Sequence, residues 1–289
     1  VPPGRIVYTQ WLNDRAGIEA DLTITRLAER EYMVVTSAIC QTRDLAWLRR
    51  AIEAQPDAHC TVTDVTSGIA MLGVMGPRSR ELLQAVSGAD LSNDAHPFGH
   101  SREIEIGYAR VRASRITYVG ELGWELYMPA EHCLDVYEQL LAAGAPLGLT
   151  LAGYHAMGAC RVEKGYKHWS HDIGDEDTPL DAGLGFTVAW DKPGGFVGRD
   201  ALLAQKAAGP LRRRLVQVML DDASDTAPLL YHEEPIVRDG VIVGSIRSGA
   251  WGHRLGRSIG MGYVSCDDGV AAEWLASGRW EVEIACRRH

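Results

Sequence analysis

Polar and apolar residues alternate along two short stretches near the start of the chain, residues 21–27 and 32–36. Alternation with a period of two is typical of half-buried strands, and only a short polar break separates these two stretches. The pattern therefore predicts a β-hairpin. Farther along, Leu45, Leu48 and Ile52 recur at the spacing of one helix face, which predicts a helix there.

The central part of the chain, from about residue 62 to 143, changes its hydrophobic period more than once. It predicts in turn a strand, a helix, a group of short strands and a second helix, at 69–74, 78–86, 102–128 and 133–141. Residues 116–118 are assigned to one of the short strands. The order is that of a split βαβ, ferredoxin-like unit, so we expect an α+β fold and not an alternating parallel α/β fold.

The last third of the chain is richer in strand patterns. After a short predicted helix near residue 200 and a glycine-proline break, closely spaced strands are predicted at 215–219, 241–243, 258–264 and 280–284. Asp-Gly pairs at 239–240 and 268–269 are typical of tight turns between strands. We therefore expect two regions, residues 1–207 and a separate small β-barrel over residues 208–289.

The composition limits the classes of function. The 289 residues are 46% hydrophobic and 23% charged, which is typical of a soluble globular protein with more than one domain. A net charge of −9 argues against a nucleic-acid partner, because phosphate binding needs a clustered basic surface. The densest basic run, Arg212 to Arg214, is interpreted as a solvated strand entry or linker.

The cysteines and the hydropathy pattern bear on the compartment. Six scattered cysteines include no C-x-x-C pair, which favours a reducing compartment. No apolar stretch approaches the length of a membrane span, and the first four residues lack the features of a signal peptide. We expect an intracellular protein without a membrane partner, in the cytoplasm or, in a eukaryote, in the mitochondrial matrix.

Two polar clusters were tested as metal sites. His168 and His171 could reach one metal ion from a helix, but no third ligand accompanies them at a recognisable spacing. Five acids crowd into residues 172–181, yet their spacing differs from that of an EF-hand calcium loop. The sequence likewise offers no nucleotide-binding motif, because the glycines of residues 244–256 form neither a dinucleotide-binding nor a P-loop fingerprint. We predict no metal site.

Three longer motifs resemble the aminomethyltransferase (glycine-cleavage T-protein) family, in the same order and at similar separations, at residues 17–23, 117–126 and 249–264. Within that family, the run from Arg161 to Leu180 is most similar to the folate-binding C-terminal region of sarcosine and dimethylglycine dehydrogenases. The sequence differs from many T-proteins at one place, because they carry two adjacent acids where this chain has Ala20 and Asp21. This difference favours the same branch of the family.

The resemblance implies a cloverleaf of three domains around a central hole that holds tetrahydrofolate, with a C-terminal β-barrel. It assigns the catalytic carboxylate to Asp21, which would orient and activate the folate N10 amine as that nitrogen attacks a one-carbon unit. Such a carboxylate must be ionised and held within about 3 Å of the nitrogen by a rigid strand end.

The resemblance also implies the residues that bind the cofactor. Tyr118 and Glu125 match positions that meet the pterin, where a carboxylate can accept two hydrogen bonds from ring donors. Arg161 either contacts the cofactor or braces the pocket wall through an internal ion pair. Trp251 and Tyr263 lie in the barrel motif, where they either stack on the cofactor or belong to the core.

The function implied is capture of a one-carbon unit from an oxidised methylamine as 5,10-methylenetetrahydrofolate. The alternatives are aminomethyl transfer in the glycine cleavage system, folate-dependent demethylation, or a non-enzymatic relative such as the family's iron–sulfur assembly factors. Relatives carry a segment before the position of Gly4, so we expect the chain to begin inside the first domain. The dehydrogenases also have an FAD domain, so we expect FAD only on a separate or missing domain.

Overall fold

The computed structural model describes residues 1–55, 57, 59–224 and 226–289. The chain forms two compact units. Unit 1 consists of Val1–Tyr8 and Leu22–Ala152, and unit 2 of Thr9–Asp21 and Gly153–His289. The chain passes from one unit to the other within its first two strands.

These strands belong to a three-stranded sheet of order β1-β2-β3, which consists of β1 (Ile6–Leu12), β2 (Ile18–Ala28) and β3 (Glu31–Val35). Strands β2 and β3 pair in antiparallel fashion, so the predicted hairpin is confirmed. The sequence did not predict β1. Its two ends are buried while the residues between them are partly exposed, and this pattern lacks the regular alternation on which the other strands were recognised.

Unit 1 contains the predicted helix α1 (Gln41–Glu53), which follows a short 3-10 turn at Ala38–Cys40. Its second half is a four-stranded sheet of order β4-β7-β6-β5, with every pairing antiparallel. The strands are β4 (Ile69–Met75), β5 (Ser101–Ile106), β6 (Ala109–Ser114) and β7 (Gly123–Pro129).

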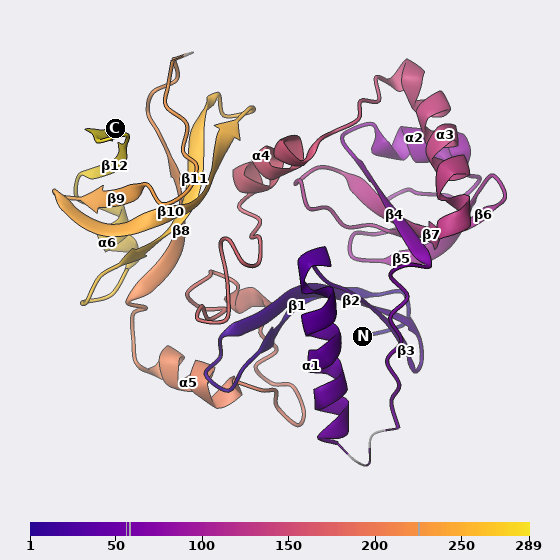
Figure 1. Ribbon diagram of the computed structural model, residues 1–289, viewed down its shortest axis with the longest axis horizontal. Coiled ribbons are helices and arrows are strands. Elements are labelled where there is room, and N and C mark those ends of the chain that lie inside the picture. The colour runs from indigo at the N-terminus through magenta and orange to yellow at the C-terminus, as the bar shows by residue number, and fades with distance from the viewer. Residues whose placement is uncertain (56, 58, 225) are drawn as a thin grey trace. The chain divides into compact units, whose positions relative to one another are not determined.

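Helices α2 (Ser79–Val86) and α3 (Cys133–Gly144) cover one face of this sheet (Figure 1). The buried residues Trp124, Leu126 and Met128 of β7 point to that face, because successive strand residues point to opposite faces. The predicted order of strand, helix, strands and helix is confirmed. Residues 116–118 are not a strand, because β6 ends at Ser114 and the chain then bends until β7 begins.

Unit 2 begins its second segment with α4 (Tyr154–Lys164) and continues through an irregular stretch to α5 (Arg199–Ala207), the short helix predicted near residue 200. Within that stretch lies a 3-10 turn, Gly185–Thr187. Apolar residues from β1, β2, the irregular stretch and α5 form one buried cluster: Leu12, Ala16, Ile18, Ile173, Ala182, Leu184 and Leu202. This cluster anchors the start of β2, the strand that carries Asp21.

The C-terminal part of unit 2 is an antiparallel sheet of order β13-β12-β9-β10-β11-β8. Its elements are β8 (Arg213–Met219), β9 (Pro235–Arg238), β10 (Val241–Gly252), β11 (Arg257–Ser265), α6 (Ala272–Ala276), β12 (Trp280–Ile284) and β13 (Arg287–Arg288). The sequence missed β9, which is only four residues long. Asp239 and Gly240 both have positive φ, as the predicted tight turn requires.

Glycines of the third motif permit close backbone packing in this sheet. A Cβ on Gly249 would lie 2.1 Å from the carbonyl oxygen of Leu230, and one on Gly262 would lie 2.2 Å from that of Ser245. Both approaches are far shorter than a van der Waals contact allows. The glycines are therefore explained by packing.

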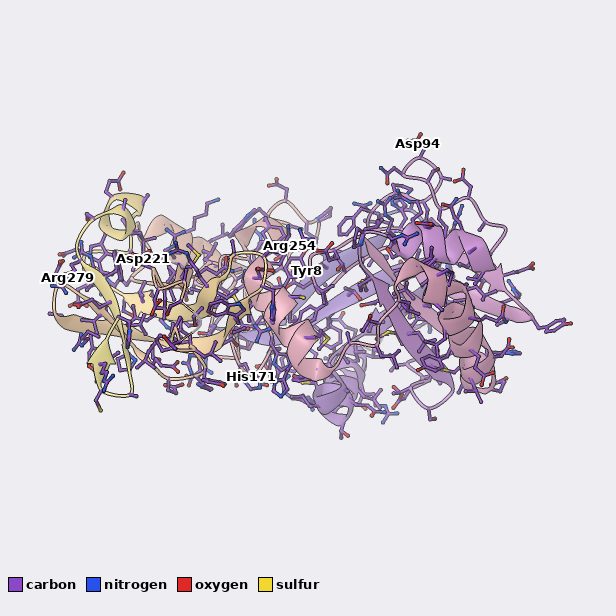
Figure 2. The ribbon with its side chains drawn as sticks, turned by 90° about the horizontal axis from the view of Figure 1, so that it is seen from above. Tyr8, Asp94, His171, Asp221, Arg254 and Arg279 are labelled. Carbon is purple, nitrogen blue, oxygen red and sulfur yellow. The ribbon has the colours of Figure 1, made fainter. Side chains whose placement is uncertain are left out.

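The remaining 3-10 turns of unit 1 lie at Ala130–His132 and Ala145–Leu147. Figure 2 shows the side chain of Asp94 on the connection between α2 and β5 of unit 1, and that of Asp221 just after β8 of unit 2. Both residues are exposed. Within the described ranges, no helix combines the length and the apolar character needed to cross a bilayer.

Candidate functional site

The start of β2 is fixed by backbone contacts on both sides. The N–H of Ile18 donates to the carbonyl oxygen of Asp177 at 2.9 Å, and the indole N–H of Trp169 donates to the carbonyl oxygen of Ile18 at 2.9 Å. A Cβ on Gly17 would lie 1.8 Å from the carbonyl oxygen of Asp175, so only glycine fits there. The first sequence motif is thus a rigid strand entry.

Asp21 lies on the half-buried face of this strand. Ile18, Ala20 and Leu22 are buried, and the alternation places Asp21 on the opposite side. Its Oδ1 accepts a hydrogen bond of 2.7 Å from Nε2 of Gln10 on the neighbouring strand β1. The amide orients the carboxylate, as expected for a group that acts at a fixed position.

Lys167 lies in the electrostatic field of the same carboxylate. Burial lowers the pKa of its ammonium, while the charges of Asp172 and Asp21 oppose this change. Its Nζ donates to the carbonyl oxygen of Gly165 at 2.9 Å. Lys167 therefore connects Asp21 electrostatically with the polar network around Arg161.

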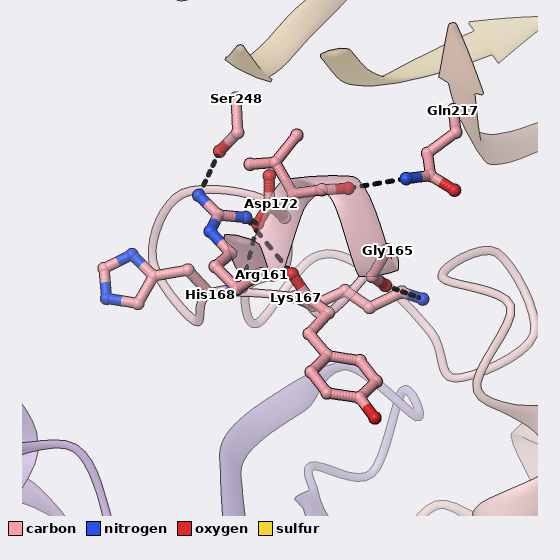
Figure 3. A network of polar contacts seen from close by, with 9 residues as sticks. Arg161, Gly165, Lys167, His168, Asp172, Gln217 and Ser248 are labelled. Carbon is pink, nitrogen blue, oxygen red and sulfur yellow. Dashed lines mark hydrogen bonds and ion pairs between the residues drawn. The ribbon is translucent and has the colours of Figure 1, made fainter. Parts of the chain in front are cut away.

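That network lies at the end of α4 and is drawn in Figure 3. The guanidinium of Arg161 forms a buried ion pair with Asp172 and donates to Oγ of Ser248 at 2.7 Å and to the carbonyl oxygen of Tyr166 at 3.2 Å. Asp172 also accepts the backbone N–H of His168 at 2.8 Å. These contacts favour the bracing role for Arg161 over direct contact with a cofactor, because its donors are turned to internal partners.

Trp251 is partly exposed on β10, close to the turn that leads to β11. The turn is tied to α4, because Oε1 of Glu163 accepts the backbone N–H groups of Arg254 at 2.8 Å and Leu255 at 3.2 Å. Tyr263 is buried, and the guanidinium carbon of Arg213 lies 3.6 Å from its ring centroid. This supports a core role for Tyr263 and leaves Trp251 as the aromatic surface of the motif.

A second group of candidate residues lies in unit 1, on the face of the sheet opposite α2 and α3. Glu125 of β7 points to this face, between Gly73 of β4 and Ser114 of β6. Burial raises the pKa of Glu125, and a hydrogen bond donated by the hydroxyl of Tyr127 partly offsets this effect. A carboxylate in such an environment gains most from a ligand that brings hydrogen-bond donors.

The structure divides the residues named from the sequence between the two units. Asp21, Arg161 and Trp251 belong to unit 2, whereas Tyr118 and Glu125 belong to unit 1. Tyr118 is half-buried in the bend that leads to β7. Within unit 2, Asp21 and Arg161 are linked through the charges of Lys167 and Asp172.

Sequence reasoning gave no role to several residues that contact the named ones, interact with them electrostatically or, as Thr187 does, contact one of their partners: Gln10, Tyr127, Lys167, Asp172, Thr187 and Ser248. Tyr127 could have been found from the alternation rule, because it lies two residues after Glu125 on the same strand face. Gln10 could not, since β1 was not recognised.

The acids of residues 172–181 are used internally. Asp172 pairs with Arg161, and Asp177 pairs with Arg213 while accepting the backbone N–H of Gly174 at 2.9 Å. Arg213 starts β8 as expected of a strand entry, but it is only partly exposed and is held in this ion pair, so the fully solvated interpretation was wrong for it. Over the ranges that the structure describes, no group of three potential ligands is arranged to hold a metal ion.

Comparison with known proteins identifies the family. Residues 1–192 match the GCVT N-terminal domain, and residues 213–289 match the glycine cleavage T-protein C-terminal barrel domain. The chain belongs to the glycine-cleavage T-protein family. This is a tetrahydrofolate-dependent aminomethyltransferase family, and the predicted T-protein fold with a small C-terminal barrel is confirmed.

Three members of the T-protein family illustrate the likeness. The 4-methylaminobutanoate oxidase (formaldehyde-forming) of Paenarthrobacter nicotinovorans is 43% identical over 95% of this chain and 32% of its own length. The mitochondrial sarcosine dehydrogenase of Homo sapiens is 38% identical over 98% of this chain and 32% of its own length. The crystal structure of the glycine cleavage system aminomethyltransferase T from Bartonella henselae, at 26% identity, matches with a TM-score of 0.83 over 100% of this chain and 74% of that one.

The chain therefore spans about a third of the length of the two curated relatives named here.

Proposed function

We propose that this chain is a tetrahydrofolate-dependent module that captures a one-carbon unit released from an oxidised methylamine, as 5,10-methylenetetrahydrofolate. One structural observation carries the proposal within the T-protein family. The Asp21 carboxylate is held at a rigid strand start, with Oδ1 fixed at 2.7 Å from the Gln10 amide. A positioned carboxylate of this kind suits a general base.

Tetrahydrofolate, when bound, supplies the nitrogen nucleophiles that take up the one-carbon unit. In our proposal Asp21 accepts the proton that leaves N10 as this nitrogen forms its bond to carbon, and it releases the proton to water afterwards. Burial lowers the pKa of Lys167, but its attraction to Asp21 favours the charged forms of both groups, and an ionised carboxylate is the basic form that the reaction needs.

Glu125 and Tyr118 are proposed to bind the pterin. The donor set of a pterin fits Glu125, because the buried carboxylate has a raised pKa and gains from N–H donors that stabilise its charge. Arg161 is proposed to brace the wall through Asp172 and Ser248, and Trp251 to present an aromatic surface to the cofactor.

The proposal is tested by formation of methylenetetrahydrofolate from formaldehyde and tetrahydrofolate, corrected for the uncatalysed condensation. Asp21→Asn keeps the shape and one acceptor oxygen but removes the charge and basicity. We expect folate affinity to change little and capture to slow by about 10²- to 10⁴-fold. Wild-type rate and affinity in the variant would refute the catalytic role, and lost affinity with unchanged saturated turnover would assign Asp21 to binding alone.

A second candidate function is aminomethyl transfer from a lipoyl protein. It is favoured by the match to the Bartonella henselae aminomethyltransferase, which extends over the whole of this chain. An assay with an aminomethyl-lipoyl donor separates the two functions, because only the second predicts release of ammonia from that donor in the presence of tetrahydrofolate.

The remaining assignments belong to the same proposal. The similarity to an oxidase and a dehydrogenase supports a partnership with an FAD-dependent oxidoreductase domain or subunit, with FAD bound outside this chain. We propose residues 1–207 as the folate-binding region and residues 208–289 as the barrel domain. The proposed compartment is the cytoplasm or the mitochondrial matrix, since one of these relatives is mitochondrial.

A further inference from the structure

Gln10 lies between Asp21 and Thr187, and all three belong to unit 2. Its Nε2 is 2.7 Å from Oδ1 of Asp21, and its Oε1 is 2.5 Å from Oγ1 of Thr187. The three side chains come from β1, β2 and the end of the 3-10 turn Gly185–Thr187, and each is half-buried. One continuous row of hydrogen bonds therefore ends on the proposed catalytic carboxylate.

The direction of these hydrogen bonds follows from donor and acceptor chemistry. An ionised carboxylate only accepts, so the Gln10 amide must turn its NH2 group to Asp21. Its oxygen then faces Thr187 and requires the hydroxyl proton. The Thr187 hydroxyl has a single proton and a second acceptor in reach, the carbonyl oxygen of Leu184 at 2.7 Å, which already accepts the Thr187 N–H at 2.9 Å. When it donates this proton to Gln10, the Thr187 hydroxyl supports the orientation in which the amide NH2 group faces Asp21.

We propose that Gln10, locked by Thr187, is a positioning residue for Asp21 that keeps an N–H donor on Oδ1 while the carboxylate accepts the proton. This inference rests on the proposed function, because it assumes that Asp21 acts as the base. The transferred proton leaves the substrate nitrogen and forms a bond to the Asp21 carboxylate, while Oδ1 continues to accept the amide N–H.

The lock has a consequence for the pH dependence of the reaction. The N–H donated by Gln10 and the positive charge of Lys167 both favour the ionised form of Asp21. Lys167 is also attracted to the negative charge of Asp172. Without the Thr187 hydroxyl the Gln10 amide oxygen loses its donor, and the amide is held less firmly in the orientation that presents its NH2 group to Asp21. The hydrogen bond to the ionised carboxylate weakens, so Asp21 would then take up its proton at higher pH.

The test compares Thr187→Val with Thr187→Ser, which retains the hydroxyl, and with Thr178→Val as a matched control. Thr178 also donates to a carboxylate, Oδ2 of Asp181 at 3.0 Å, but one that the mechanism does not use. In Thr187→Val we expect kcat for capture to fall about 10-fold and the acid limb of its pH profile to move to higher pH by on the order of one unit. Folate affinity should stay unchanged.

Thr187→Ser should restore both the rate and the profile, and Thr178→Val should leave the profile in place. A merely structural role for Thr187 would lower activity without moving the profile. Gln10→Met, which keeps the length but removes the amide, provides the same test if Thr187→Val does not fold, and it should shift the profile in the same direction.

A double-mutant comparison separates failure of this inference from failure of the proposed function. In an Asp21→Asn background the Thr187→Val substitution should have no further effect on kcat, because the group that it positions is gone. If Asp21→Asn alone behaves as wild type, the proposed function fails. If Asp21→Asn slows capture while folded Thr187→Val and Gln10→Met keep the wild-type rate and profile, the inference alone is overturned.

Discussion

In unit 2 the carboxylate of Asp21 receives an amide N–H and lies near the charge of Lys167, and the neighbouring Arg161 is paired with Asp172. In unit 1 the carboxylate of Glu125 accepts a hydrogen bond from the neutral hydroxyl of Tyr127, and burial raises its pKa. The difference suits two roles. A base must be ionised before the reaction, whereas a binding carboxylate can wait for its ligand to supply the compensating donors.

His96 of unit 1, like Glu125, lies in an environment that favours its uncharged form. Burial lowers its pKa to about 4, and its Nε2 lies 3.0 Å from the carbonyl oxygen of His100, consistent with a neutral ring. In unit 2 two buried acids are instead held in ion pairs, Asp172 with Arg161 and Asp177 with the partly exposed Arg213. The stability of unit 2 should therefore be sensitive to the loss of one partner of such a pair.

The largest expected effect concerns such a pair. Asp172→Asn leaves the buried guanidinium of Arg161 without its counter-charge and should lower the free energy of unfolding by about 3–5 kcal/mol. Denaturant titration measures the change. Glu281→Gln, which removes the partner of the exposed Arg279 in the same unit, is the control and should change stability little. Equal effects of the two substitutions would contradict the larger contribution assigned to the buried pair.

The next effect concerns ligand binding by unit 1. Glu125→Gln retains the shape but loses the charge, so tetrahydrofolate affinity should fall by about 10- to 100-fold while turnover at saturation is retained. Glu105→Gln, an exposed acid on β5, should bind folate normally. If Glu125→Gln lowers saturated turnover and leaves affinity intact, the roles assigned to the two carboxylates are reversed.

The Glu125→Gln substitution should also change the stability of the folded protein. Because the pKa of Glu125 is raised in the folded protein, ionising it opposes folding as pH rises from the ordinary carboxyl range through the raised value. Removing the charge should therefore raise the free energy of unfolding at neutral pH relative to wild type. Below the ordinary carboxyl range, where the group is protonated in both states, the difference should vanish.

The smallest effect concerns Tyr127. Its hydroxyl lowers the pKa of Glu125 by hydrogen bonding to it, so Tyr127→Phe should raise that pKa further. In our account folate binds the ionised carboxylate. As the pH is lowered, the variant should therefore lose its affinity for folate at a higher pH than the wild type does. Affinity measured across the pH range gives the comparison. At high pH the variant and the wild type should converge, and a uniform loss at every pH would assign Tyr127 to direct contact instead.

The sequence predicted the elements with a regular period and missed those without one. The hairpin, the α+β order of unit 1 and strands β8, β10, β11 and β12 of the C-terminal sheet were recognised because their apolar residues form regular patterns or continuous runs. Strand β1 lacks such regularity, and β9 is too short to establish a pattern. Missing β1 also meant missing Gln10, the residue that holds Asp21.

The candidate site was predicted as single residues and not as their contacts. The motifs drew attention to Asp21, Glu125 and Arg161, but the pairing of Arg161 with Asp172 and Ser248 depends on how α4, the following turn and β10 pack. Residues 11 and 87 positions apart in the chain meet there. Such partners are set by tertiary packing, which periodicity along one segment does not encode.

The central claim is that this chain binds a reduced folate, with Glu125 proposed as a binding residue and Asp21 as a base that contributes little to affinity. Isothermal titration calorimetry of the purified protein with tetrahydrofolate and, separately, with FAD tests it most directly. The account predicts binding of tetrahydrofolate in preference to FAD, weakened by Glu125→Gln and retained in Asp21→Asn. Tight binding of FAD without binding of tetrahydrofolate would contradict it.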